Sequence, residues 1–193
     1  MNSKSKRQQR RRYRRIQKLK NTLLWGGVGI LALLGIGFLV VRQASRPAAM
    51  GEAVPLMSAS HVPLDSDPGV YNSDPPTSGP HYAEEARAGF YDENIYTYPA
   101  GYLVHNLEHG YVIFWYNCRL LDQDGCANLK SQIKTVMDEL GGVKIIAYPW
   151  PSLDVPVAMT SWGRLLKFET FDAEQAKAFY RANLNRAPEP NAP

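Results

Sequence analysis

The chain has 193 residues, of which 45% are hydrophobic, and a formal net charge of +4 at pH 7. That length accommodates one ordinary domain with appendages. Ten of the 22 Lys and Arg residues lie in residues 1–20 without any acid, whereas from residue 47 onward ten basic residues face all 18 acids. The basic pI therefore belongs to the N-terminal tail, and the charge argues against a nucleic-acid-binding domain.

An uncharged stretch follows the basic tail. Residues 23–41 contain no charged side chain, and a membrane-spanning helix needs about 20 such residues. The ten basic residues before this stretch, against Arg42 and Arg46 after it, place the N-terminus in the cytoplasm. We therefore expect a cytoplasmic tail at 1–22 that contacts anionic lipid headgroups, and a single transmembrane helix at 23–41 in the lipid bilayer of the cell membrane.

A cleaved signal peptide is the alternative interpretation of the same stretch. Its apolar core is usually only ~7–15 residues long, and the sole cleavage-like site is the weak run at 47–49. With an uncleaved anchor, residues 42–56 form a linker, 57–185 an extracytoplasmic globular domain and 186–193 a disordered tail.

The two cysteines lie in this extracytoplasmic part. Cys118 and Cys126 are separated by seven polar, turn-like residues, and an oxidising compartment favours a disulfide between them. Two unpaired thiols in a loop are the alternative. The spacing is not C-x-x-C, so it indicates neither a thioredoxin-type redox pair nor a four-cysteine zinc site.

A long segment at 61–102 has little periodicity and many Pro and Gly residues. Such a loop is unusual in a compact domain, but aromatic residues alternate with its turns. This pattern predicts a segment wrapped onto a core, in which a stiff proline-rich run at 75–80 presents His81. The aromatic residues are Tyr71, Tyr82, Phe90, Tyr91, Tyr96, Tyr98 and Tyr102.

The remainder alternates between strand and helix patterns. Its apolar and β-branched runs predict strands, and apolar residues at helical spacing predict helices. The order β-α-β-β-α implies an α+β or mixed α/β domain, a small mixed sheet with two packed helices. The expected elements are strands at 111–116, 143–148 and 157–168, the last with a hairpin or bulge at Gly163, and helices at 126–140 and 172–183.

Two blocks carry a family resemblance. Residues 73–82 (SDPPTSGPHY) and 105–110 (HNLEHG) resemble the hallmark blocks of the bacterial domain of unknown function 3105. Supporting matches are His61 with Tyr71, the segment 116–118 and the block 159–163. The resemblance covers residues 57–183 and implies one N-terminal membrane helix, but it implies no reaction.

The second block also spells the H-x-x-E-H pattern of inverted zinc peptidases, in which a helix presents both histidines to one zinc ion. Gly101 and Gly110 bracket His105, Glu108 and His109 here. Because a strand follows at once, we expect a short turn rather than a helix. A fully extended segment would hold the two histidines roughly 13 Å apart, so the local conformation decides the function.

Our functional hypothesis is a zinc or copper site built from histidines, because neutral imidazoles commonly bind both metals. Glu108 would orient an imidazole or act as a catalytic base on bound water, and Met159 is a soft ligand that would favour copper. Alternatively, the histidines only hydrogen-bond loop carbonyls. The candidate ligands are His81, His105 and His109, with His61 as a further one.

Two other classes of function stay open. The aromatic segment 61–102 could make the domain a non-catalytic envelope module that binds an unknown protein partner. A metal-dependent hydrolase that uses Glu108 is the third possibility. No phosphate-binding loop, dinucleotide fingerprint or haem-attachment motif is present, so the sequence supplies no substrate.

Overall fold

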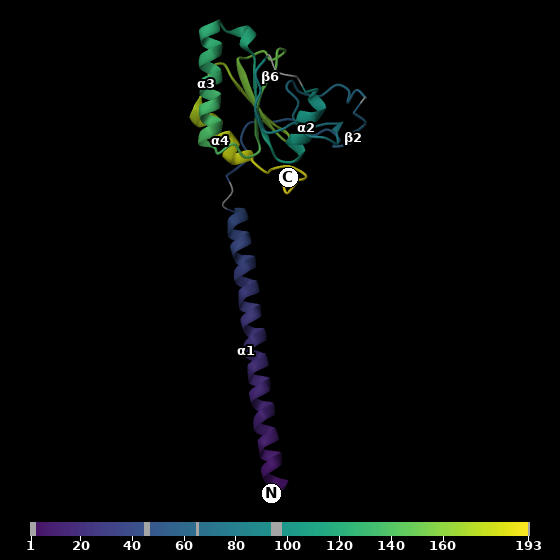
Figure 1. Cartoon of the computed structure of the whole chain (residues 1–193), viewed down its shortest axis with the longest axis vertical. Coiled ribbons are helices and arrows are strands. Elements are labelled where there is room, and N and C mark those ends of the chain that lie inside the picture. Colours follow the sequence, from purple (N-terminus) through teal and green to yellow (C-terminus); the bar gives the residue numbers. More distant parts are fainter. Residues whose placement is uncertain (1–2, 45–46, 65, 94–97, 193) are drawn as a thin grey trace. The chain divides into compact units, whose positions relative to one another are not determined.

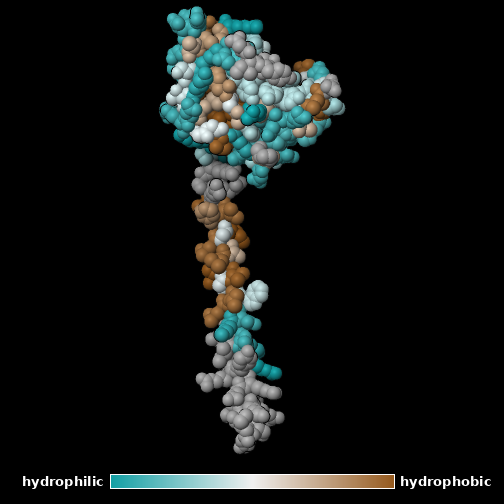
Figure 2. All heavy atoms as spheres, viewed as in Figure 1, coloured by the Kyte–Doolittle hydropathy of each residue, from teal (hydrophilic) through white to brown (hydrophobic). Residues whose placement is uncertain are grey.

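A computed structural model describes residues 3–44, 47–64, 66–93 and 98–192. The chain divides into two units after residue 46. The first unit is one helix, α1 (Ser3–Ala44), whose large apolar side chains between Leu23 and Val41 are exposed (Figure 2). Among the described residues, no helix combines the length and apolarity needed to cross a membrane. The transmembrane helix predicted at 23–41 is therefore not supported.

The second unit is built on a six-stranded mixed sheet with the strand order β1-β8-β7-β5-β6-β4. Central β5 runs parallel to β6 and antiparallel to β7, while β7 and β8 form a hairpin that turns at Gly163. The predicted mixed α+β class is confirmed. The strands are β1 (Glu52–Ala53), β4 (Gly89–Phe90), β5 (Val112–Tyr116), β6 (Ile145–Pro149), β7 (Val157–Ser161) and β8 (Arg164–Phe168).

Strand β5 is buried on both faces because helices cover both sides of the sheet (Figure 1). Phe114 packs with apolar residues of α3 (Gln123–Glu139) and α4 (Ala173–Asn183) in one cluster. Trp115 packs in the other cluster, with Leu103 and Leu107 of α2 (Ala100–Glu108). The unbroken apolar run of β5 thus reflects a strand enclosed between two layers.

The two predicted helices begin at capping aspartates. Asp122 accepts a hydrogen bond from the backbone N–H of Gly125 at 2.7 Å, so α3 starts three residues before the predicted position. Asp172 accepts from the backbone N–H of Gln175 at 3.0 Å and starts α4 where the sequence indicates. Each side chain satisfies one of the free N–H groups of a first helical turn.

Both ends of the globular unit extend further than predicted. Strand β1, inside the expected linker 42–56, pairs with β8 and so belongs to the sheet. At the other end, the segment 186–192, expected to be disordered, is hydrogen-bonded to the domain. Lys144 Nζ donates to the carbonyls of Pro190 (3.0 Å) and Ala192 (2.7 Å), and the Glu189 N–H donates to the Glu108 carbonyl (3.1 Å).

The described parts of the aromatic segment 61–102 contact both sides of the sheet, since Phe90 packs against the core cluster that contains Phe114. Two of its pieces, β2 (His61–Val62) and β3 (His81–Tyr82), form a separate two-stranded parallel sheet, and β4 joins the edge of the main sheet. Tyr91 and Tyr98 pack against the core cluster that contains Trp115. Tyr96 lies outside the described residues.

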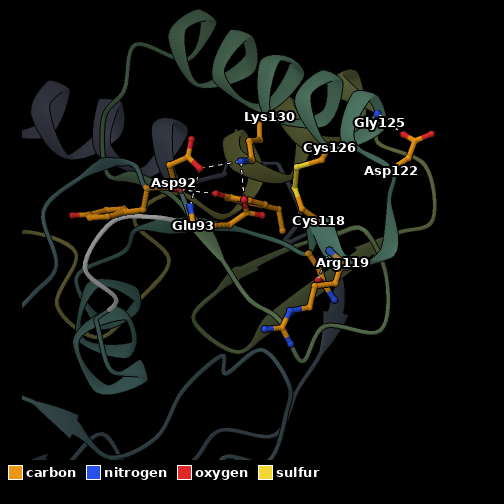
Figure 3. The surroundings of a disulfide bond; sticks show 11 residues. Asp92, Glu93, Cys118, Arg119, Asp122, Gly125, Cys126 and Lys130 are labelled. Carbon is orange, nitrogen blue, oxygen red and sulfur yellow. Dashed lines mark hydrogen bonds and ion pairs between the residues drawn. A yellow bond between two sulfur atoms is a disulfide. The ribbon is translucent and has the colours of Figure 1, made fainter.

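A disulfide joins Cys118 to Cys126, as predicted (Figure 3). It links a short 3-10 helix, η1 (Cys118–Leu120), to the first turns of α3, with the two Cα atoms 5.2 Å apart. Beside it, Lys130 Nζ lies 2.9 Å from carboxylate oxygens of both Asp92 and Glu93. The bond therefore fastens the end of β5 to the helix that follows it.

Replacing both cysteines by serine should lower the free energy of unfolding by about 2–3 kcal/mol, because an eight-residue separation closes a short loop in the unfolded chain. Urea unfolding followed by tryptophan fluorescence measures this loss. Wild-type protein under reducing conditions is the matched control and should show the same loss. An unchanged midpoint in both samples would contradict a stabilising disulfide.

Candidate metal centre

The H-x-x-E-H block lies on a helix, so the short turn expected there is wrong. Helix α2 begins directly after Pro99 and ends before His109. Its nine residues are too few for a stable isolated helix, but Leu103 and Leu107 are fully buried on the sheet. Packing on the sheet therefore stabilises α2, although the bracketing glycines argued against a helix. Gly110, with φ +84°, then turns the chain into β5.

Strand pairing brings two more histidines to this helix. His61 and His81 are direct partners in the parallel β2–β3 pair, with ring centroids 4.9 Å apart. Helix α2 lies against β3 at Gly101, where an added Cβ would be 2.7 Å from the ring of Tyr82. Gly101 therefore permits the close approach that places His105 and Glu108 beside the strand histidines.

Four side chains meet at this contact. His81 Nε2 lies 2.8 Å from Glu108 Oε2, and His61 Nε2 lies 3.6 Å from the same oxygen. The ring of His105 is 5.3 Å from that of His61 and 5.2 Å from that of His81, between centroids. One ligand atom from each of the four residues lies within 4.8 Å of all the others, and only His61, with 49% of its side chain exposed, is open to solvent.

The contacts of His81 leave room for only a proton or a metal ion between its ring and Glu108. Its Nδ1 lies 2.8 Å from the Gly79 carbonyl, which can only accept, so Nδ1 carries a hydrogen. Nε2 of a neutral ring would then direct its lone pair at the Glu108 carboxylate, 2.8 Å away. A proton or a metal ion must separate the two groups. An Nδ1–H bound to a backbone carbonyl is also the usual support of a histidine that binds metal through Nε2.

His105 has an unpaired nitrogen beside the same contact. Its Nδ1 is buried and has no hydrogen-bond partner among the described residues. Burial, with the positive charges that His109, His81 and His61 can carry, lowers the pKa of His105 from 6.5 to about 4, opposed by a hydrogen bond to the backbone of Tyr82. A neutral imidazole with a free nitrogen is a ready metal ligand.

The structure places the other predicted ligands elsewhere. His109, one turn after His105, has its Nδ1 3.1 Å from Glu85 Oε2 and its Nε2 3.7 Å from Glu189 Oε2. Met159 is fully buried in the core cluster under α3 and α4, on the opposite face of the sheet from α2. Cys118 and Cys126 lie near Glu93, but their sulfur atoms are committed to the disulfide.

Glu85 and Glu189 are the residues that sequence reasoning missed. Neither belongs to a recognisable motif, and each reaches His109 only through the fold. The distance in sequence from the H-x-x-E-H block did not indicate either of these acidic residues as a partner of His109.

The four-residue set could hold a single first-row metal ion. Ligands at about 2.0–2.1 Å from a tetrahedral zinc ion lie roughly 3.4 Å from one another. The observed separations of 2.8 and 3.6 Å from Glu108 bracket that value, so small side-chain movements would admit an ion. Three imidazoles and a carboxylate form a nitrogen and oxygen donor set without sulfur.

In metal-free protein the unfolding free energy should fall as the pH drops from 6.5 to about 4. The pKa of His105 is lowered in the folded state, so the unfolded chain binds more protons in this window and stability rises with pH. At 1.36 kcal/mol per pKa unit, the contribution is at most about 3 kcal/mol. Urea unfolding at several pH values tests this. His105→Gln should flatten the slope, and an equal slope in both proteins would contradict the assignment.

Comparison with known proteins identifies the family. A family model described as "Protein of unknown function (DUF3105)" matches residues 65–193, about two thirds of the chain. The match includes His81, α2 and the disulfide. Neither the curated proteins nor the solved structures contain a significant match. The chain belongs to the DUF3105 family of proteins of unknown function.

Proposed function

We propose that the globular unit is a metal-binding domain in which His61, His81, His105 and Glu108 hold one divalent ion, zinc or copper(II). The observation that carries this proposal is the contact between His81 Nε2 and Glu108 Oε2. A proton or a metal ion must lie between these two atoms, and the unpaired Nδ1 of His105 beside them favours the metal. Three of the four ligands are buried, and His61 leaves the site open to solvent on one side.

The donor set supports the choice of ion. The preference for copper rested on the thioether of Met159, which packs in the core on the other face of the sheet. Without a sulfur ligand, a site for copper(I) loses its support, because soft ligands select that ion. Imidazole and carboxylate suit zinc and copper(II), and we take zinc as the first ion to test.

Substituting His61 by alanine should weaken zinc binding by more than about 100-fold, because changes in residues that merely orient metal ligands already cost 10–100-fold. His61 is chosen for substitution because its side chain is half exposed. Its replacement should therefore leave the domain folded, so that a lower zinc affinity reports the loss of a ligand. The untagged full-length chain, stripped with a chelator, is titrated with zinc calorimetrically. Competition with a fluorescent chelator gives the affinity.

Met159→Leu is the matched control. It preserves the core volume within a small stability change, and its zinc affinity should equal that of wild type because Met159 lies outside the site. Equal zinc affinity in wild type and His61→Ala, or absence of binding in wild type, would refute the proposed site. A lower zinc affinity in Met159→Leu would show instead that Met159 is a ligand of the ion.

A metal-dependent hydrolase is a second candidate, and the helical setting of the H-x-x-E-H block now supports it. In this candidate the buried Glu108 would not bind the ion itself but would take a proton from water bound to the ion. Glu108→Gln should then abolish turnover of ester or peptide substrates by the zinc-loaded protein. Zinc retained by this variant with unchanged turnover would contradict a catalytic base.

We also propose, from the sequence, that this domain lies outside the cytoplasm and is attached to the cell membrane by residues 23–41, with the basic tail against anionic headgroups. The disulfide fits an oxidising compartment. Membrane fractions washed with alkaline carbonate should keep the chain, and deletion of 23–41 should release it. Full release of the wild-type chain by carbonate would contradict the anchor.

A further inference from the structure

His109 is a buried histidine that the proposed four-residue site does not use. It lies at the C-terminal end of α2, only 8% exposed, and each of its ring nitrogens faces a carboxylate. Nδ1 is 3.1 Å from Glu85 Oε2, whereas Nε2 is 3.7 Å from Glu189 Oε2. A neutral ring donates from one nitrogen only, so one carboxylate faces a lone pair unless a cation is present.

The ring of His105 completes a second group of ligands. Residues four apart on a helix share one face, and the centroids of the His105 and His109 rings are 4.2 Å apart. One ligand atom each from Glu85, His105 and His109 lies within 4.8 Å of the others. Two imidazoles and one carboxylate are a donor set found at zinc sites that keep a position open for water or substrate.

Glu85 is held in this place by buried hydrogen bonds of its neighbour. The side-chain amide of Asn106 accepts from the Ala86 N–H and donates to the Ala86 carbonyl, both at 2.9 Å. Asn106 and Ala86 are fully buried. The backbone next to Glu85 is therefore fixed to α2, one residue after His105, so the carboxylate belongs to a rigid part of the fold.

We propose that Glu85, His105 and His109 bind a second divalent cation beside the ion of the proposed function. His105 Nδ1 is its one nitrogen without a partner, so it serves a single ion. The first ion of the proposed function then loses its His105 ligand and keeps His61, His81 and Glu108, because His105 belongs to both groups of ligands. The domain then holds two ions, each with three protein ligands and positions open to water or substrate.

Glu85 is assigned to this site in preference to Glu189. Glu85 is closer to His109 and less exposed, with 38% of its side chain accessible against 57% for Glu189. The group that contains Glu189 also needs Glu108, whose Oε2 already contacts His81 and His61. The two-ion arrangement rests on the proposed function, whereas the second site depends on its own residues.

Counting zinc ions per chain tests the second site. The untagged full-length chain and its variants are loaded with zinc and desalted, and the bound zinc is measured by elemental analysis. Wild type should hold two ions, Glu85→Gln one and His61→Ala one. Two exposed carboxylates serve as matched controls: Glu84→Gln, beside Glu85 in sequence, and Glu189→Gln, beside His109 in space, should each keep two.

The outcomes separate the two sites. One ion in wild type that is lost in His61→Ala and kept in Glu85→Gln overturns the second site and leaves the proposed function standing. One ion that is lost in Glu85→Gln and kept in His61→Ala supports the second site and removes the first. Loss of an ion in Glu189→Gln but not in Glu85→Gln overturns the choice of ligand. Circular dichroism confirms that each variant is folded.

Discussion

The docking of α2 onto the strand pair β2–β3 is the constraint on which both candidate sites depend. Gly101 lets the helix approach the ring of Tyr82, and the amide of Asn106 fastens the helix to the backbone of Ala86. These contacts are dry, so loss of the Asn106 amide would leave two buried polar groups unsatisfied. Every histidine of the chain lies on one of the three elements joined here or directly after them.

Burial of these side chains gives the cluster its chemical character. Burial, with the positive charge that the neighbouring histidines can carry, lowers the pKa of His105. The buried carboxylate of Glu108 has the opposite need and is stabilised by a nearby cation. A divalent ion satisfies both conditions at once, because it takes the imidazole lone pairs and compensates the carboxylate.

The four longer strands, β5 to β8, and the helices α3 and α4 were predictable because their signals are local. The apolar run of β5, the hairpin at Gly163 and the cap at Asp172 each lie within a few residues of the structure that they specify. The cysteine pair was equally local, with a short polar loop between its members. The helix α2 was missed because a nine-residue helix that contains Gly101 and is soon followed by Gly110 has weak intrinsic helicity, which burial of Leu103 and Leu107 on the sheet outweighs.

The sequence by itself determined which side chains could carry chemistry: four histidines and Glu108, with a disulfide near them in the chain. Only the tertiary structure decided how they group. It paired His61 with His81 across two short strands, moved Met159 to the opposite face of the sheet and brought Glu85 to His109. Such groupings depend on strand register and on helix docking between distant segments, and no local pattern encodes either of them.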